Sequence, residues 1–526
     1  MGKRGRMCSD LFPDLLECSS SSSGATLSTS SWNDDIDRLS ELPDVLRLHI
    51  LSLLPLKSAI RTGVLSSRWR GLWTHRWPDP SSLFLSSHSS SLIFPKLAAA
   101  AVVEEDAFVS STNHCLLKRG RRRIDSFVLS FHQGQVLQSD LKQWLDYAAA
   151  CSVEDFHLHV LPAEPVTASA SLSRRNSNVN RRRNASSVSF HFPMESLLLT
   201  RLSLRGIHLS AANSASTRLE ILTLHSVTLS EAALRKVVAA CPVLRYLDIR
   251  RCKELRRIQI SASGPHLRSL TVVDCPKATE LVVTSAPGLR SFRFCGTFLS
   301  KYSIENAKRL EEVYFTSAGP NLSLPNSNWV TCFEQLANVT VHTLCSHALQ
   351  YIAVRGAGTI GPTRSLYQLE ELQLLMLMMS DSNLNDVFAF LKLYQCPVLE
   401  RLFVEFPTCT LDQHVVNYME IADEEPPREY LDKLKTIKIR NYKGHYNEMR
   451  LVQFLLAKAT NLSSLIIIAP RENFEKEYSK DPSDWLRSLH MQFSLFQKVS
   501  ESAQICFSEC DIDGIQPTHS EAFFKF

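Results

Sequence analysis

The sequence lacks the features that would direct the chain into a membrane or a secretory pathway. No stretch of its 526 residues approaches the ~18 consecutive apolar residues that a membrane-spanning helix needs. The N-terminal stretch MGKRGRMCSDLFPDLLECSS is basic but has no sustained apolar region, which argues against a secretory signal. We therefore expect an intracellular protein of the nucleus, the cytoplasm or both, without a membrane partner.

The sequence also lacks the spacing of common metal and catalytic sites. Its 14 cysteines form no CxxC pair and no Cys/His arrangement typical of zinc. The GxxxxGK[ST], HExxH and GxSxG motifs are absent. GAGTIG at 356–361 matches GxGxxG, but Pro362 follows where a nucleotide-binding helix would begin, so we interpret it as a loop. We expect no enzymatic activity, no cofactor and no bound metal.

Positive charge is concentrated in two short runs. KRGRRR at 118–123 and RRNSNVNRRR at 174–183 hold five basic residues each, and without them the net charge of +5 would become slightly negative. No broad basic face for nucleic acid is therefore expected. The two runs fit either solvated loops or nuclear import signals.

Two Leu-Pro pairs frame an apolar stretch, LPDVLRLHILSLLPLKSAI, at 42–60. Pro43 suits the first turn of a helix, where its missing N–H is not needed, whereas Pro55 cannot continue one. The apolar side chains between the prolines recur at helical spacing; they are Leu46, Ile50, Leu53 and Leu54.

This segment is too short to fold around a core of its own. Two further short helices are predicted at 57–62 and 66–73, the latter carrying Trp69, Leu72 and Trp73. Three such helices contain roughly thirty residues, fewer than the ~40 that an independent core needs. Ser-rich sequence flanks the segment on both sides. We expect a docking module completed by a partner, although a buried helix of a larger domain would show the same periodicity.

LPDVLRLHILSLLPLKSAIRTGVLSSRWRGLW resembles the F-box of plant proteins in its Leu-Pro opening, its Leu-Leu-Pro turn and its SxRWxxLW ending. The resemblance implies that the segment docks on a Skp1-like adaptor and, through it, on a cullin of a ubiquitin ligase. The residues that would face the adaptor are Leu42, Pro43, Ile50, Leu53, Leu54 and Pro55. Trp69 and Trp73 would pack within the module or against the next part of the chain.

A second pattern, Leu-x-x-Leu-x-Leu, recurs along the chain from 199 to 467, with looser versions at 124–129 and 153–158. Alternating apolar residues predict short strands with one buried face. Between 244 and 310 the repeats are 21 to 23 residues apart, with half-repeats such as LRRIQI at 255, so each should contain one concave and one convex strand. Longer repeats leave room for a helix, which should end at the CPVL turns before 244 and 399.

This periodicity resembles leucine-rich repeats over 121–470, and YLDKLKTIKIRNYKGHYNEMRLVQFLLAKATNLSSLIIIAP resembles the FBD region of plant F-box proteins. The resemblance implies an α/β protein: a three-helix F-box followed by a solenoid that an FBD-like strand–helix–strand unit closes. Cys252 and Cys275 lie nine residues into their repeats, where such thiols bond the turn, so a structural role is favoured over a reactive one. The predicted order is a disordered tail 1–35, the F-box 36–80, a linker 81–120, repeats 121–425 with a disordered insertion near 161–193, the FBD-like region 426–510 and a tail 511–526.

The repeat frame also predicts which side chains face the core. Positions one, four and six should point inward, which buries Leu247, Ile249, Leu270 and Phe292. Positions three, five and seven should then form ladders on the concave face. The candidate target-binding residues on that face are Arg201, Arg205, His225, Tyr246, Arg250 and Arg293. These mostly basic ladders fit either an ordinary solvated strand face or a site for an acidic or phosphorylated target.

Two functions from different classes remain open. The chain is either the substrate-recognition subunit of an SCF-type ubiquitin ligase, with the repeats holding an unknown target protein, or a scaffold or small-molecule sensor whose F-box only holds the adaptor. Recovery of a cullin together with the adaptor distinguishes the first from the second.

Overall fold

The computed structural model describes most of the region from residue 39 to residue 520. The described ranges are 39–54, 61–64, 66–72, 82–87, 103–163, 188–192, 198–211, 218–262, 264–317, 338–356, 364–407, 426–470, 482–508 and 514–520, with the single residues 59, 194, 328, 332, 333, 336 and 511. The predicted disordered tail 1–35, the basic run at 174–183 and Pro55 lie outside them.

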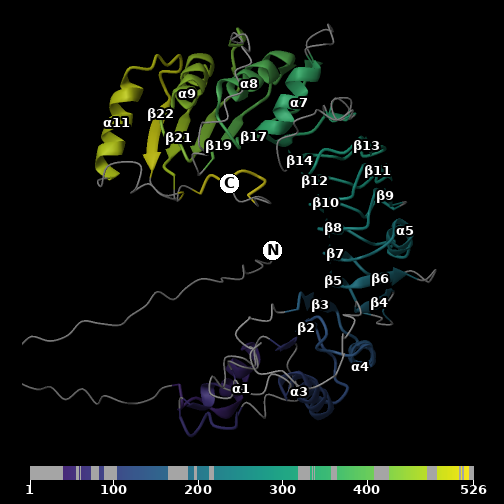
Figure 1. Cartoon of the computed structure of the whole chain (residues 1–526). Helices are drawn as coiled ribbons and strands as arrows, with labels where there is room; N and C mark the ends of the chain where they lie inside the picture. The colour runs from purple at the N-terminus through teal and green to yellow at the C-terminus, as the bar shows by residue number, and fades with distance from the viewer. Residues whose placement is uncertain are drawn as a thin grey trace, which may run out of the picture.

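A curved sheet of 15 parallel strands forms the body of the protein, which has the shape of an open arc (Figure 1). In spatial order its strands are β1 (Ser82–Ser86), β2 (Ser126–His132), β3 (Asp155–Leu161), β5 (Arg201–Arg205), β7 (Ile221–His225), β8 (Tyr246–Arg250), β10 (Ser269–Val273), β12 (Ser291–Gly296), β14 (Glu312–Ser317), β15 (Val341–Cys345), β17 (Glu371–Leu375), β19 (Arg401–Glu405), β20 (Thr436–Arg440), β21 (Ser464–Ile468) and β22 (Gln504–Ser508). Apart from a few short outer strands, the order in space follows the order in the sequence, as stacked repeats require.

The outer side of the arc changes along its length (Figure 1). Short outer strands are β4 (Ser189–Phe192) with β6 (His208–Ala211), then β9 (Arg257–Ser261), β11 (Glu280–Ser285) and β13 (Lys301–Ile304), and finally β16 (Arg364–Ser365) with β18 (Tyr394–Gln395). The helices of the repeats are α3 (Val103–Arg119), α4 (Gln138–Ala150), α5 (Glu231–Ala239), α7 (Ser346–Gly356), α8 (Asp381–Leu393), α9 (Tyr446–Lys458) and α11 (Pro482–Ser494). The prediction of two strands per repeat between 244 and 310 is confirmed, and α5 and α8 end at the two CPVL turns as predicted.

The core lies between these two layers and is continuous along the arc. Leu247, Leu270 and Phe292 are aligned in neighbouring strands by the parallel register. All three, together with Ile249, are at most 1% exposed, so the predicted inward positions are confirmed. The alternation of residues along each strand is sufficient to predict which side chains are buried here, because the outer layer covers only one face of the sheet.

Several turns of the arc use a left-handed residue directly after a strand. Ser226, Arg251 and Asp274 have φ values of 53°, 53° and 49°, and their N–H groups donate to a carbonyl at or next to the end of the neighbouring strand at 2.7–2.8 Å. The hydrogen-bond ladder therefore continues through the turn while the chain leaves the sheet. The thiols of Cys252 and Cys275 follow, both buried, and donate to the carbonyls of Arg250 and Val273 at 3.6 and 3.7 Å. This is the structural role predicted for them.

The structure differs from the sequence analysis at three segments. The expected linker 81–120 contains β1, which pairs with β2, and the helix α3. The expected disordered insertion near 161–193 ends in β4, which pairs with β6. The expected tail 511–526 begins with residues that pack against the main sheet, as described below. In each case pairing with sequence-distant residues supplies the order, and local composition does not report such pairing.

Two further observations concern the described residues as a whole. None of their helices combines the length and apolar character needed to cross a bilayer. They also contain no cluster of three or more His, Cys, Asp or Glu side chains arranged to hold a metal ion.

Candidate functional site

The N-terminal module is built on α1 (Asp44–Leu53), which begins directly after Pro43 as predicted. Its small core consists of Leu51, Ala59 and Trp69. Ile50 and Leu54 pack against this core and stay partly exposed. Trp69 therefore packs within the module, as expected.

Polar contacts hold the ends of the module together. Trp69 Nε1 donates to Ser40 Oγ at 3.1 Å, and Arg68 donates to the Ser40 carbonyl at 3.0 Å. The buried Arg47 of α1 donates to the Arg68 carbonyl at 2.7 Å. The segment 66–72, part of the third helix predicted at 66–73, consists mainly of turns closed by i+3 backbone bonds. These polar contacts fix the segment without a regular helix.

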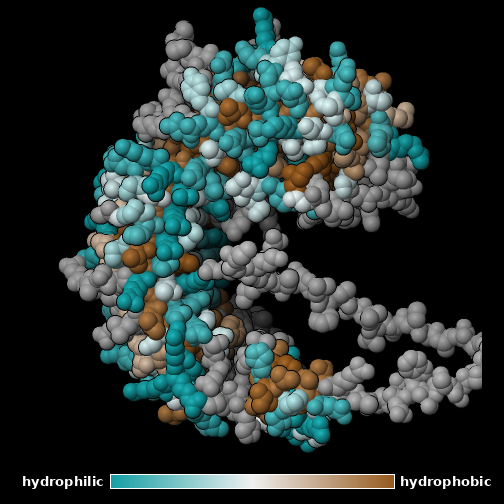
Figure 2. Space-filling model, turned by 180° about the vertical axis from the view of Figure 1, so that it is seen from behind, coloured by the Kyte–Doolittle hydropathy of each residue, from teal (hydrophilic) through white to brown (hydrophobic). Residues whose placement is uncertain are grey.

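The same module leaves large apolar side chains in solvent. Val45 and Val64 are 76% and 90% exposed, and Leu39 and Leu46 are about half exposed or more. Figure 2 shows apolar surface at the end of the arc where Figure 1 places α1. Such surface is unusual for a short module unless another chain covers it.

The six predicted adaptor-facing residues are only partly described. Leu42, Ile50 and Leu54 are partly exposed, and Pro43 is exposed. The side chain of Leu53 and the whole of Pro55 lie outside the described residues. Their role stays a prediction, and the exposed Val45 and Val64 join them as candidates that the Leu-Pro motif did not single out.

The second candidate surface is the concave face over β3, β5, β7 and β8. The parallel register places His159, Arg205, His225 and Arg250 opposite one another in a single row, here called the basic row. At a strand spacing of ~4.8 Å the row is ~14 Å long. Arg201 is the first residue of β5 and Tyr246 is the first residue of β8, so both lie at the strand ends away from the basic row, and both are exposed. Arg293 lies on β12, two strands beyond β8, and is half-buried.

The arginines of this face are not equivalent. Arg250 binds Asp248 of the same strand through both carboxylate oxygens, with N–O distances of 2.7–3.0 Å. This bidentate pair already satisfies much of the Arg250 guanidinium. Arg205 is exposed at the centre of the basic row. Arg205 is therefore the stronger candidate for binding an external anion.

The histidine at the start of the basic row was missed by the sequence analysis. His159 is half-buried beside His157, with ring centroids 5.8 Å apart, and its Nε2 lies 3.5 Å from Ser203 Oγ. The 161–193 insertion separates β3 from β5 in the sequence and hides their pairing. The looser frame at 153–158 was the available signal, since His157 and His159 occupy its concave positions.

The basic row has a positive local environment. Burial, followed by the charges of His157, Arg205 and His225, lowers the pKa of His159 to about 4. Burial and the neighbouring arginines 205, 251 and 250 also lower the pKa of His225. Burial is the main cause of both shifts, and the neighbouring cations add to it. Because these cations make the local potential positive, an anion is favoured over a further cation on this face.

Comparison with known proteins identifies the two parts of the chain that carry these surfaces. Residues 39–79, which contain α1 and its small core, match the F-box domain. Residues 122–492 match the family described as At1g61320/AtMIF1, LRR domain, over well more than half of the chain. The chain belongs to the plant F-box/LRR-repeat proteins. No catalytic domain is among these matches.

Relatives of this F-box/LRR-repeat protein come from Arabidopsis thaliana. The FBD-associated F-box protein At5g53635 is 25% identical over 452 residues, which cover 81% of this chain and 94% of the relative. The F-box/FBD/LRR-repeat protein At2g04230 is 25% identical over 321 residues, or 60% and 64% of the two chains. The F-box/LRR-repeat protein At3g26922 is 27% identical over 288 residues, or 52% and 81%. In this chain the segment resembling the FBD region folds as the expected strand–helix–strand unit of β20, α9 and β21.

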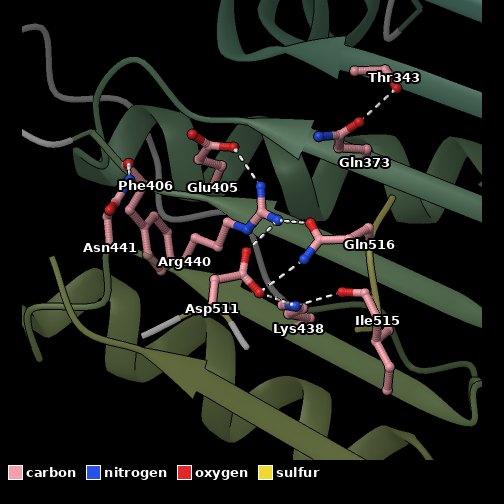
Figure 3. A network of polar contacts seen from close by, with 10 residues as sticks. All are labelled: Thr343, Gln373, Glu405, Phe406, Lys438, Arg440, Asn441, Asp511, Ile515 and Gln516. Carbon is pink, nitrogen blue, oxygen red and sulfur yellow. Dashed lines mark hydrogen bonds and ion pairs between the residues drawn. The ribbon is translucent and has the colours of Figure 1, made fainter. Parts of the chain in front are cut away.

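In this F-box/LRR-repeat protein the later part of the concave face is covered by the chain itself. The segment Asp511–Ser520, described at 511 and 514–520, has no helix or strand and lies across the inner side of the sheet between β14 and β20 (Figures 1 and 3). At one end Asp511 accepts from Lys438 of β20 at 2.6 Å and pairs with Arg440 at 2.5 Å. Burial opposes ionisation of Asp511, but the Lys438 hydrogen bond and the Arg440 charge outweigh it and lower the pKa of Asp511.

The other end of this C-terminal segment reaches β14, β15 and β17. The Thr518 N–H donates to Glu371 at 2.7 Å. The buried His519 lies 2.8 Å from Thr343 Oγ1, and its Nε2 lies 3.6 Å from a Glu312 oxygen. The hydrogen bond with His519 lowers the pKa of Glu312. The concave face thus has an open part over β3–β8 and a covered part over β14–β20.

Proposed function

We propose that this chain is the substrate-recognition subunit of an SCF-type ubiquitin ligase. Its F-box docks a Skp1-like adaptor and through it a cullin, while the open concave face binds a target protein. The observation that carries the proposal is the pairing of an F-box that has uncovered apolar surface with a repeat arc whose basic row is open. The chain itself is non-catalytic in this role and needs no cofactor.

The adaptor half of the proposal rests on burial of apolar surface. Covering an exposed Val or Leu is worth ~1.5–3 kcal/mol, so two such residues contribute enough to decide complex formation. Leu42, Pro43, Ile50, Leu53, Leu54 and Pro55 remain the proposed contact residues. Ile50 and Leu54 also pack on the Leu51–Trp69 core, so charges introduced there would disturb the module as well as the interface.

A cleaner test changes the exposed side chains of α1. Val45→Asp with Leu46→Asp should reduce adaptor capture by about a hundredfold or more, because two buried apolar contacts are lost and two charges are buried instead. Leu137→Asp is the matched control, since Leu137 is exposed and is the N-cap of α4, where Asp is favourable. Capture is measured with purified Skp1-like adaptor. Equal capture by the double variant and the control would refute the docking assignment.

The target half of the proposal rests on the basic row. Hydrogen bonds to charged groups contribute ~1.5–3 kcal/mol, and Arg offers two of them to one carboxylate or phosphate. We propose that the row binds an acidic or phosphorylated stretch of the target, with Arg205 as its main contact. Arg201, His225, Tyr246, Arg250 and Arg293 surround it on the same face.

The corresponding experiment compares proteins recovered from cells with the F-box intact. Arg205→Glu should lose the target but keep the adaptor, and Arg250→Glu should weaken target recovery less because Arg250 is already paired with Asp248. Arg256→Glu, an exposed change beside the outer strand β9, is the matched control. Identical protein sets from Arg205→Glu and the control would show that the row is only solvated surface. Recovery of adaptor without cullin would instead favour a scaffold outside any ligase.

A further inference from the structure

The covered part of the concave face is polar beneath its cover. Glu371, Thr343 and Lys438 have side chains that are almost fully buried, and Gln373 is 4% exposed. All four point to the concave side, in the same rows as the solvent-facing positions of β5–β8. Buried groups of this kind need hydrogen-bonding partners. The covered concave side of these strands is thus largely polar, with Phe403 of β19 as an apolar member of the same row.

The C-terminal segment makes its polar contacts with this surface chiefly at two ends. At one end Lys438 donates both to Asp511 and to the Ile515 carbonyl, and Arg440 binds Asp511 and Gln516 (Figure 3). At the other end Glu371 accepts from the Thr518 backbone, and Thr343 and Tyr314 contact His519. Pro517 lies between these two groups of contacts and is buried, whereas residues 514–516 keep exposed surface despite the contacts of Ile515 and Gln516.

Two observations bear on whether this segment can be exchanged. A cavity of only ≈ 10 Å³, roughly the room for one water molecule, lies between Pro517 and the side chains of Gln373, Phe403 and Lys438. The last strand of the sheet, β22, ends at Ser508, before the segment begins, and the described part of the segment forms no strand. Its departure therefore leaves the strand order intact and uncovers these hydrogen-bonding groups together with the apolar side chain of Phe403.

We propose that the concave face over β14–β20 is a second binding site for an extended peptide and that Asp511–Ser520 is its resident, exchangeable ligand. The incoming peptide is a segment of the target protein, so this proposal rests on the proposed function. Its chemistry is set by the groups it must satisfy: a carboxylate for Lys438 and Arg440, and eight residues later a ring or other group that bonds Thr343. The basic row then holds one part of the target and this site holds another.

The test uses a fluorescent peptide with the sequence of the resident segment, DIDGIQPTHS, and the full-length chain. Asp511→Asn with His519→Ala weakens the resident at both ends. This double variant should bind the peptide about tenfold tighter than the wild-type chain or more, because the resident no longer competes for the site. Adding Lys438→Met should remove that gain, and a peptide carrying the same two substitutions should bind neither chain.

Equal peptide affinity for the wild-type chain and the double variant would overturn the proposal, as would binding that survives Lys438→Met. If the double variant does not fold, hydrogen exchange on the wild-type chain decides the question. The Thr518 amide donates a hydrogen bond to Glu371, so displacement of the segment by excess peptide should speed hydrogen exchange of that amide. Unchanged exchange would also overturn the proposal. Adaptor capture by the same proteins reports on the F-box separately, so failure here is distinguishable from failure of the ligase assignment.

Discussion

Gly288 allows two neighbouring repeats to approach more closely than any other residue would permit. It lies in the turn between β11 and β12, and a Cβ at this position would be 1.9 Å from the Pro265 carbonyl oxygen and 2.5 Å from its carbon. The obstacle is backbone, so no side-chain rotation relieves it. The oxygen must retreat by about 1 Å before the contact reaches even 3.0 Å.

Gly288→Ala should therefore separate the two repeats locally. Overpacking typically costs ~1–3 kcal/mol, and an immovable backbone neighbour places this case at the upper end. The lower entropy of the unfolded Ala chain offsets ~0.4–1 kcal/mol of that cost. We expect a net loss of roughly 2 kcal/mol or more in the free energy of unfolding.

Gly264 provides the matched control in the preceding turn. A Cβ there would meet only a His266 ring carbon at 3.3 Å and the Pro242 carbonyl oxygen at 3.4 Å. Gly264→Ala should thus change stability by ~1 kcal/mol or less. Urea unfolding of the full chain, followed by circular dichroism, measures both variants from the shift in midpoint. Equal midpoints for the two variants would show that the repeats are not in the contact described.

Three further predictions concern other parts of the arc. Leu270→Ala should lower the free energy of unfolding by ~2–5 kcal/mol, because Leu270 is fully buried between two strands, and a smaller loss in urea unfolding would contradict the core register. Burial raises the pKa of Asp386 in α8 from 3.8 to about 7, so the folded chain keeps a proton that the unfolded chain releases. The stability that comes from this retained proton is fully present below pH ~4 and is lost as pH rises through 7, which lowers the free energy of unfolding by up to ~4 kcal/mol. Asp386→Asn should therefore reduce the difference between the urea midpoints measured at pH 5 and at pH 8. A thiol reagent at pH 8 should modify the exposed Cys506 well before the buried Cys252, whose pKa is raised by its hydrogen bond with Cys275 and by burial; mass spectrometry of the labelled peptides checks the order.

Much of the arc could be predicted because its information is local. Alternating apolar residues identify the inward face of each strand, and Leu247 and Phe292 are buried for that reason alone. Half-repeats about eleven residues apart, such as the frames at 244 and 255, leave no room for a helix, which is why β9, β11 and β13 form the outer layer there. The Leu-Pro motif likewise predicts a helix that opens at Pro43, and α1 begins at the next residue, Asp44, with Pro43 as its N-cap.

The parts that could not be predicted depend on residues far apart in the sequence. Thr518 and Glu371 are 147 positions apart, and nothing near either residue indicates that they bond. His159 joins the basic row only because β3 pairs with β5 across a long insertion. The bond between Asp248 and Arg250 is a different case. Residues two apart in a strand share a face, so their spacing alone could have indicated that Arg250 is already paired.

The position of the C-terminal segment also has a consequence for biosynthesis. Translation delivers residues 511–520 after every strand of the main sheet, although they contact strands made as early as β14 and β15. The repeats around Lys438 and Glu371 are therefore complete in sequence before the residues that cover them are made. A transcript cut short after β22 would yield every repeat and an intact F-box, yet a concave surface unlike that of the finished protein. In this chain, residues 511–520 determine whether the buried polar side chains of β15, β17 and β20 are covered.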